Sequence, residues 1–196
     1  MSKSDPSAAK KERSKTIRWV VTIFFVTILV SGIISLLSDV LMSVSGIIVA
    51  FVVLMVIILV GIIFDIIGVA VTSADEKPFH SMAARKVPGA QEAIKLLRNA
   101  ERVGSICNDV IGDICGVVSG SAAATIAAQV IARTDFPIPK LIVLLMSSLV
   151  AGFTVGGKAI GKSIAIESCT IIVSGVGNLI YLLRHPSKIF SKKKKK

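Results

Sequence analysis

The sequence predicts an all-α integral membrane protein with about four transmembrane helices, a re-entrant or interfacial C-terminal segment and a cytoplasmic amphipathic juxtamembrane helix. Three observations lead to this fold class. The 196-residue chain is 53% hydrophobic with a mean hydropathy of +0.80, which is more apolar than a soluble core of this length requires. Two segments are long and apolar enough to cross a bilayer. Lys and Arg residues gather beside the apolar segments rather than within them.

The first two predicted membrane helices are the most apolar parts of the chain. Ile17 to Leu37 has no charge after Arg18, and Ser45 to Ala70 contains one ionisable residue, Asp65. About 20 residues, each rising 1.5 Å, cross roughly 30 Å of hydrocarbon, so both segments are predicted to span. The first apolar run exceeds the ~7–15 residues of a signal peptide. We therefore expect it to remain in the protein as an anchor.

The net charge of +11 is concentrated in three regions, and this distribution predicts the topology. Residues 1–18 hold six Lys and Arg residues, residues 73–103 hold six more, and the tail after Leu183 holds seven. Short cytoplasmic loops collect such cations. We therefore expect a multi-pass protein of the cell membrane with both termini in the cytoplasm.

The basic tail suggests a lipid partner rather than a nucleic acid. The basic runs flank apolar helices and have no accompanying set of aromatic residues for base stacking, so nucleic-acid binding is not expected. Cations near a membrane surface are attracted to anionic lipid headgroups by about 1 kcal/mol each. The five residues expected to make this contact are Lys192, Lys193, Lys194, Lys195 and Lys196.

Glycine spacing in the segment from about Val103 to Ala132 predicts a helix-packing face. Gly112, Gly116 and Gly120 recur every four residues, which lets a second helix approach closely in a membrane. We therefore expect a homodimer that packs through this face.

Three further elements are expected along the chain. Phe79–Arg102 has apolar residues at helical spacing and is predicted to be one amphipathic helix at the inner interface. A helix from about Ile138 to Val155 is expected to end in a flexible basic elbow over residues 156–162. For Ile164–Leu183 we favour a re-entrant or interfacial segment, because basic residues flank both of its ends; the alternative is a full span.

The ionisable residues inside the predicted spans are the candidate functional residues. A charge near the bilayer centre costs at least about 2.5–3.5 kcal/mol, so such residues face a cavity, a partner or a substrate path. Mg²⁺ is bound by hard oxygen ligands, usually one or two carboxylates with retained waters. We predict a metal site formed by Asp65, Asn108, Asp109 and Asp113. The alternative is that these carboxylates pair with Lys158, Lys162 or Arg102, or stay protonated.

Three short motifs carry a family resemblance. They are GVAVTS (residues 68–73), KVPGAQEAIKLLRNAER (86–102) and VGGKAIGKSIA (155–165). In order and spacing they are similar to SETALTS, GNxGAxxALxLLxNPER and FGEILPKALA of the CNNM/CorB–CorC magnesium and cobalt transporter family. Residues from about Phe64 to Pro186 therefore resemble the transmembrane domain of that family, in divergent form.

The resemblance implies a domain organisation. Residues 1–16 are expected to be a disordered basic cytoplasmic arm, and residues 17–44 an extra N-terminal transmembrane helix with an outer turn. Residues 45–186 would form the CNNM/CorB-like transmembrane domain, and residues 187–196 a basic cytoplasmic tail. The paired CBS modules of typical members are lacking in this sequence. Gly68 and Lys158 stand where the family has glutamates.

Two functions follow as expectations. The first is a transporter-like protein for divalent cations of the Mg²⁺/Co²⁺ class, with an ion path between the second and third membrane helices. The alternative is a non-transporting membrane scaffold or subunit that keeps the fold and has lost the ion site. We expect no cofactor beyond Mg²⁺ as a transported ion. No nucleophile–histidine arrangement or phosphate-binding glycine loop occurs, so enzymatic activity is not expected.

Overall fold

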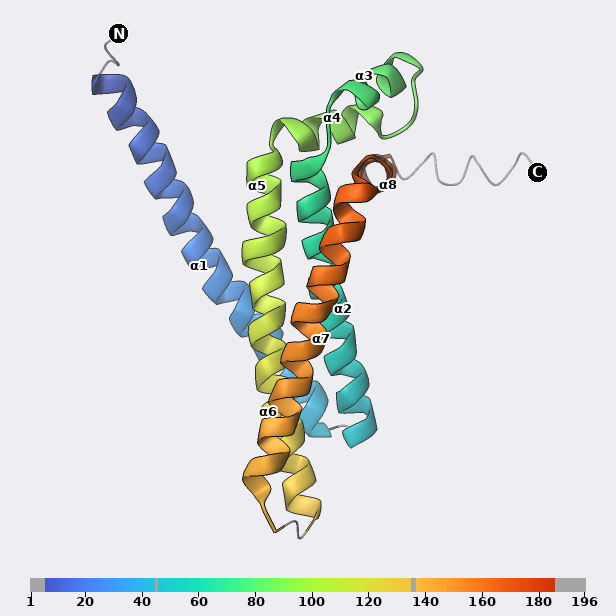
Figure 1. Cartoon of the computed structure of the whole chain (residues 1–196). Helices are drawn as coiled ribbons and strands as arrows, with labels where there is room; N and C mark the ends of the chain where they lie inside the picture. The colour runs from blue at the N-terminus through green and yellow to red at the C-terminus, as the bar shows by residue number, and fades with distance from the viewer. Residues whose placement is uncertain (1–5, 45, 135–136, 186–196) are drawn as a thin grey trace, which may run out of the picture.

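A computed structural model describes residues 6–44, 46–134 and 137–185, and over these ranges the chain is helical with no strand. Four long helical units form an elongated bundle, and shorter helices cap one end of it (Figure 1). The elements are α1 (Pro6–Val44), α2 (Ile47–Ser73), α3 (Lys77–Ala84), α4 (Ala90–Arg98), α5 (Ala100–Ser105), the π-helix η1 (Ile106–Gly112), α6 (Asp113–Arg133), α7 (Pro139–Glu167) and α8 (Cys169–Arg184).

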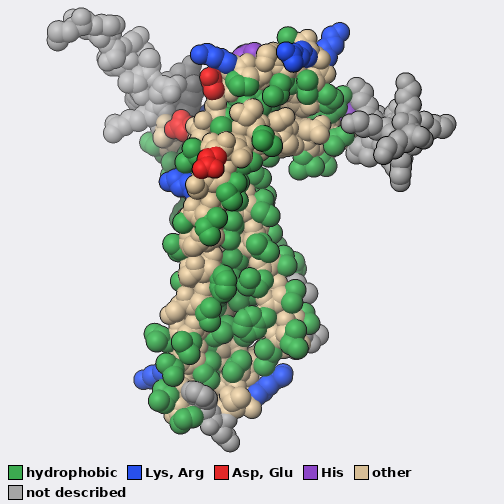
Figure 2. All heavy atoms as spheres, turned by 45° about the vertical axis from the view of Figure 1, so that its right-hand side comes forward, with side chains coloured by type: hydrophobic (Ala, Val, Ile, Leu, Met, Phe, Trp, Pro, Cys, Tyr) green, Lys and Arg blue, Asp and Glu red, His purple; other side chains and the backbone are tan. Residues whose placement is uncertain are grey.

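Four helical units are long and apolar enough to cross a membrane, which confirms the predicted fold class. The spans are Thr16–Ser38, Ile47–Ser73, Ala100–Arg133 and Pro139–Glu167. Hydrophobic side chains cover the shaft of the bundle, whereas charged side chains gather at its wide end, with basic ones again at the narrow tip (Figure 2). An apolar shaft between two polar ends is the surface that a bilayer requires. The chain is therefore a multi-pass membrane protein.

The long helices alternate in direction. α1 runs from the capped end to the narrow tip, α2 returns, α5, η1 and α6 descend as one continuous unit, and α7 returns again (Figure 1). The start of α1, the α3–α4 cap and α8 consequently lie at the same end. That the capped end faces the cytoplasm stays a prediction from the Lys and Arg distribution.

The first helix is longer than expected. The predicted disordered arm over residues 1–16 is wrong for residues 6–16, which form the first turns of α1; residues 1–5 lie outside the described residues. Pro6 stands at the first helical position, where proline is favoured, and the Ala, Lys, Glu and Arg residues that follow have high helix propensity. α1 also continues to Val44, so the helix includes residues that we expected in an outer turn.

The amphipathic connector is divided among α3, α4 and the first residues of α5 rather than forming one helix. The prediction of a single helix over Phe79–Arg102 is wrong because the chain breaks between α3 and α4, where Lys86 and Gly89 have φ angles of 56° and 83°. Pro88 contributes to the break, since the residue before a proline is disfavoured in helical conformation. The apolar face expected for this segment is present on α4, where Ala90, Ala93 and Leu97 are buried.

Close backbone contact holds the cap on α8. A Cβ atom on Gly89 would lie 2.5 Å from the backbone N and Cα atoms of Asn178, and one on Gly177 would lie 2.6 Å from the carbonyl oxygen of Gly89. No side chain fits at either position without moving the main chain. The two glycines therefore set the distance between α4 and α8.

The expected flexible elbow over residues 156–162 is also wrong, because α7 continues as one helix to Glu167. Gly157 and Gly161 serve close packing instead. A Cβ atom on Gly161 would lie 2.7 Å from Cγ1 of Ile66, and one on Gly157 would overlap the side chain of Ile62. α2 side chains thus rest directly on the α7 backbone.

The C-terminal apolar segment forms α8, which lies across the bundle rather than along it (Figure 1). The helix axis changes direction at Ser168, between α7 and α8. α8 has 16 residues, fewer than the about 20 needed for a span. This arrangement agrees with a re-entrant or interfacial segment rather than a fifth crossing.

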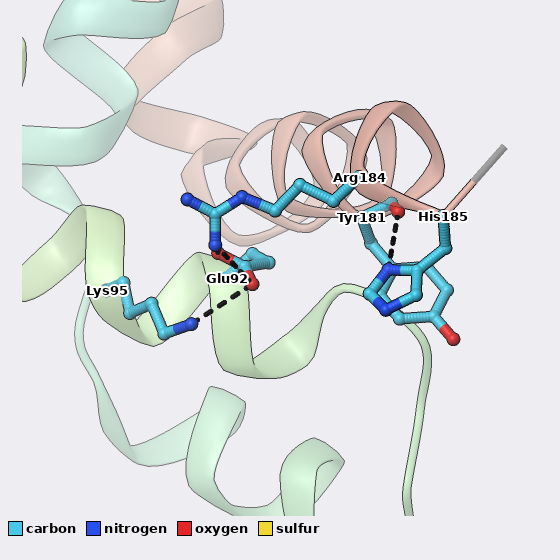
Figure 3. A network of polar contacts seen from close by, with 5 residues as sticks. All are labelled: Glu92, Lys95, Tyr181, Arg184 and His185. Carbon is cyan, nitrogen blue, oxygen red and sulfur yellow. Dashed lines mark hydrogen bonds and ion pairs between the residues drawn. The ribbon is translucent and has the colours of Figure 1, made fainter.

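A charged cluster joins the C-terminal end of α8 to α4 (Figure 3). Nη1 of Arg184 donates to both carboxylate oxygens of Glu92 at 3.2 and 3.3 Å, and Nζ of Lys95 donates to Oε1 at 3.1 Å. The rings of Tyr181 and His185 stack beside this cluster with centroids 4.8 Å apart. The hydrogen bond from Lys95, opposed in part by desolvation and assisted by the charge of Arg184, holds the pKa of Glu92 below its ordinary value.

This lowered pKa predicts an acid-labile contact between α4 and α8. A depressed carboxyl pKa stabilises the folded state above the unfolded pKa of about 4.3, and the stabilisation is lost as the pH falls through the folded value. Thermal unfolding between pH 6 and pH 3 should therefore show a fall in Tm that is smaller in Glu92→Gln than in the wild type. Glu101→Gln, at an exposed position on α5, is the control and should keep the wild-type profile. Identical profiles for wild type and Glu92→Gln would contradict the assignment.

Candidate intramembrane polar site

An ion pair lies inside the membrane-spanning part of the bundle. Nζ of Lys158, on α7, is 3.7 Å from Oδ1 of Asp65, on α2, and the two side chains are 27% and 15% exposed. The distance exceeds the usual hydrogen-bond range, so the attraction is between charges rather than through a short hydrogen bond. Of the alternatives drawn from the sequence, pairing with Lys158 is the one found for Asp65.

The pair lies between two apolar clusters. On the side of the narrow tip, residues of α2, α6 and α7 pack together around Leu54, Ile126 and Val150. At the capped end, residues of α2, α7, α8 and the connector pack around Val71 and Ala165. Asp65 and Lys158 lie between these clusters along their own helices. The polar site therefore interrupts an otherwise apolar core.

Gly112 provides the space into which the pair projects. A Cβ atom at this position would lie 3.3 Å from Nζ of Lys158, 4.0 Å from Oδ1 of Asp65 and 3.4 Å from the carbonyl oxygen of Cys107. The ammonium group and the carboxylate thus lie together at one small space beside η1. Any larger side chain at Gly112 would press on the ammonium group.

The π-helix lies at this site. η1 has i→i+5 hydrogen bonding over Ile106–Gly112, a rare form that is frequent at functional sites. Asn108, on η1, points its side chain towards Gly68 of α2, where a Cβ atom would overlap Oδ1. Oδ1 of Asn108 is buried and has no hydrogen-bond partner among the described residues. A buried acceptor without a partner costs about 1–3 kcal/mol, which makes Asn108 a candidate ligand.

The other two predicted metal ligands lie elsewhere. Asp109 and Asp113 are exposed, and Oδ2 of Asp109 accepts a 2.7 Å hydrogen bond from the hydroxyl of Ser105. Within the described ranges, no three His, Cys, Asp or Glu side chains lie close enough together to share a metal ion. The structure therefore brings two of the four predicted ligands, Asp65 and Asn108, to the interface of α2 with η1. Asp109 and Asp113 do not join Asp65 in an acidic cluster.

The predicted glycine face divides into two parts. Gly112 is buried against Lys158, whereas Gly116 and Gly120 have open space where a Cβ atom would stand. In an α-helix of 3.6 residues per turn, each step of four residues turns the face by about 40°, so Gly120 points roughly 80° away from Gly112. The open part remains available to a partner helix.

The predicted headgroup ligands Lys192, Lys193, Lys194, Lys195 and Lys196 lie outside the described residues.

Sequence reasoning gives Lys158 too small a role. From the sequence, Lys158 is only one of three cationic residues that could pair with the aspartates. The elbow predicted over residues 156–162 also places it outside the membrane helices. Its position three residues before Gly161 is the informative signal, because on one continuous helix both residues face α2. An unbroken α7 would have placed Lys158 opposite Asp65.

Comparisons with protein-family models, with curated proteins and with solved structures found no match.

The ion pair predicts a non-additive mutant cycle. Asp65→Asn leaves the ammonium group of Lys158 without its counter-charge, and Lys158→Met leaves the carboxylate alone, so each single change should destabilise the fold. The double variant removes both charges and should recover part of the loss, with a coupling of about 0.5–3 kcal/mol. Unfolding of the four proteins in detergent measures this coupling. Strictly additive effects would mean that the pair has no energetic role.

Proposed function

We propose that the chain is a transporter-like membrane protein for divalent cations of the Mg²⁺/Co²⁺ class, with an ion path between α2 and the α5–η1–α6 unit. The observation that carries the proposal is the polar site in the apolar core. Asp65 and Lys158 lie beside a π-helix, and the buried amide oxygen of Asn108 has no partner among the described residues. Charges inside a membrane are costly, and they occur mainly where a protein moves or binds polar substrates.

The oxygen atoms of the site suit a hard cation. They are the Asp65 carboxylate and the Asn108 amide oxygen, both at the interface of α2 with η1. Mg²⁺ is commonly held by one or two carboxylates, with waters in the remaining positions. Asp65 lies eight residues before the end of α2 at Ser73, about 12 Å along the helix, so the site is near the capped end.

The resemblance to the CNNM/CorB–CorC family supports the same proposal. Two residues within its motifs depart from the family and favour the scaffold alternative. Gly68, which makes room for Asn108, and Lys158, which pairs with Asp65, stand where the family has glutamates. Membership of that family, a cell-membrane location and cytoplasmic termini remain parts of the proposal. The chain's own residues are proposed to supply all of the chemistry, without a resident cofactor or an enzymatic step.

A specific observation favours the second candidate, a non-transporting scaffold or subunit. The positive charge of Lys158 already balances Asp65, while Asp109 and Asp113 are exposed away from the pair. A site neutralised in this way has less attraction for a free cation. The scaffold would retain the glycine packing between α2, η1 and α7 without conducting ions.

Flux measurements discriminate between the two candidates. Purified protein in liposomes that contain a Mg²⁺-sensitive dye should take up Mg²⁺, and Asp65→Asn should reduce the initial rate at least about tenfold, as expected for loss of ~1.4 kcal/mol or more of binding. Asp75→Asn, in the exposed turn after α2, is the matched control and should retain uptake.

The double variant Asp109→Asn/Asp113→Asn locates the path. If the path follows the α2–η1 interface, this variant should keep most of its uptake. A loss in this variant, with normal uptake in Asp65→Asn, would move the path to the exposed face of α5–α6. Absence of uptake by the wild type would leave the scaffold as the function.

We also propose a homodimer formed through the open part of the glycine face, with the terminal lysines on anionic lipid headgroups. Gly116 and Gly120 have space for a second helix, and small residues of this kind support close helix association in membranes. Gly120→Leu should raise the dimer dissociation constant at least about tenfold, or ~1.4 kcal/mol. Light scattering over a range of protein-to-detergent ratios measures this shift. Gly32→Leu, on α1 and also in open space, is the control; equal effects of both changes would argue against this face.

A further inference from the structure

We propose that the ammonium group of Lys158 occupies the position of a metal cation in the intramembrane site, so that a free divalent cation binds only when this side chain is withdrawn. The inference rests on the proposed function for the identity of the ion. It adds a regulatory role for one residue, a tethered cation that competes with the transported one.

The first argument is the chemistry of the surroundings. The Asp65 carboxylate, a hydrogen-bond acceptor, lies 3.7 Å from the Lys158 ammonium group, and both groups face Gly112 of η1. Asn108 adds a buried acceptor oxygen on the same α2–η1 interface. A site composed of acceptors favours a cation, and Lys158 is the cation now present.

The second argument is that the pair is incompletely bonded. At 3.7 Å from Oδ1 of Asp65, the ammonium group balances the carboxylate without a short hydrogen bond, and Oδ1 of Asn108 is left without a partner among the described residues. Lysine has a compact charge on a flexible stem, so its charge can be positioned here without filling every acceptor. A hydrated Mg²⁺ could engage more of these oxygens, because its waters extend its reach.

The third argument is that Lys158 has a route out of the site. Its side chain is 27% exposed, whereas that of Asp65 is 15% exposed. A lysine stem can reach along an apolar surface while its charged end moves to a polar boundary. The capped end of the bundle, where charged side chains gather, provides such a boundary (Figure 2).

As a consequence, the ammonium group of Lys158 competes with free Mg²⁺ for the site at a high local concentration. A tethered group acts at an effective concentration in the millimolar range or above, so the wild type should bind Mg²⁺ much more weakly than a variant without the ammonium group. Lys158→Met keeps most of the side-chain volume and removes the charge. We expect it to bind Mg²⁺ at least about tenfold more tightly than the wild type.

Thermal unfolding in detergent tests this expectation with Mg²⁺ as the probe. The Tm of Lys158→Met should rise in a saturable manner with MgCl₂ at constant ionic strength, because a ligand that binds only the folded state stabilises it. Lys162→Met, an exposed lysine one turn further along α7, should behave as the wild type. Lys158→Met/Asp65→Asn should lose the response. If Lys158→Met responds no more than Lys162→Met, the inference is wrong.

A measurement on the wild type keeps the inference testable if Lys158→Met does not fold. Binding of Mg²⁺ should displace the Lys158 amine and raise its labelling by an amine-reactive reagent, as quantified by mass spectrometry, with Lys162 as the internal reference. Labelling of Lys158 that does not change with Mg²⁺ would overturn the inference. The proposed transport can be rejected independently of this inference. If the wild type shows no Mg²⁺ uptake while Lys158→Met binds Mg²⁺, transport is rejected and the inference is retained.

Discussion

The structure depends on the close approach of three helices through glycine. In a membrane, lipid is as apolar as a leucine side chain, so helices associate through tight packing rather than through exclusion of water. α2 contacts η1 at Gly68 and α7 at Gly157 and Gly161, while Gly112 admits the Asp65–Lys158 pair. These positions fix the helices at distances that larger residues would not permit. The polar site exists because the backbones are this close.

Tight packing and buried charge act together at this site. The apolar clusters on either side exclude alternative arrangements of α2 and α7, and the ion pair offsets the cost of placing each charge in the bilayer. The result is a closely packed frame around a few polar groups.

The sequence predicted the elements whose signal is local. Long apolar runs located α1 and α2, and the length of a bilayer gave their approximate extents. It did not predict where glycine supports packing rather than flexibility: Gly157 and Gly161 indicated an elbow, yet their role depends on Ile62 and Ile66 of a distant helix. The π-turn was likewise not evident, because no local residue pattern distinguishes it from a turn of α-helix. Asp65 was identified as a site residue from its isolation in an apolar run, whereas its partner required knowledge of the fold.

The contact between Gly89 and Asn178 has a mechanical consequence. α4 rests on the α8 backbone and is joined to α5 through Asn99 alone, and α5 continues directly into η1. A tilt of α8 would therefore act, through α4 and the one-residue link at Asn99, on the helical unit that carries Asn108. Because α8 lies across the bundle at its capped end, a change in bilayer thickness that tilted α8 would reach the polar site along this route.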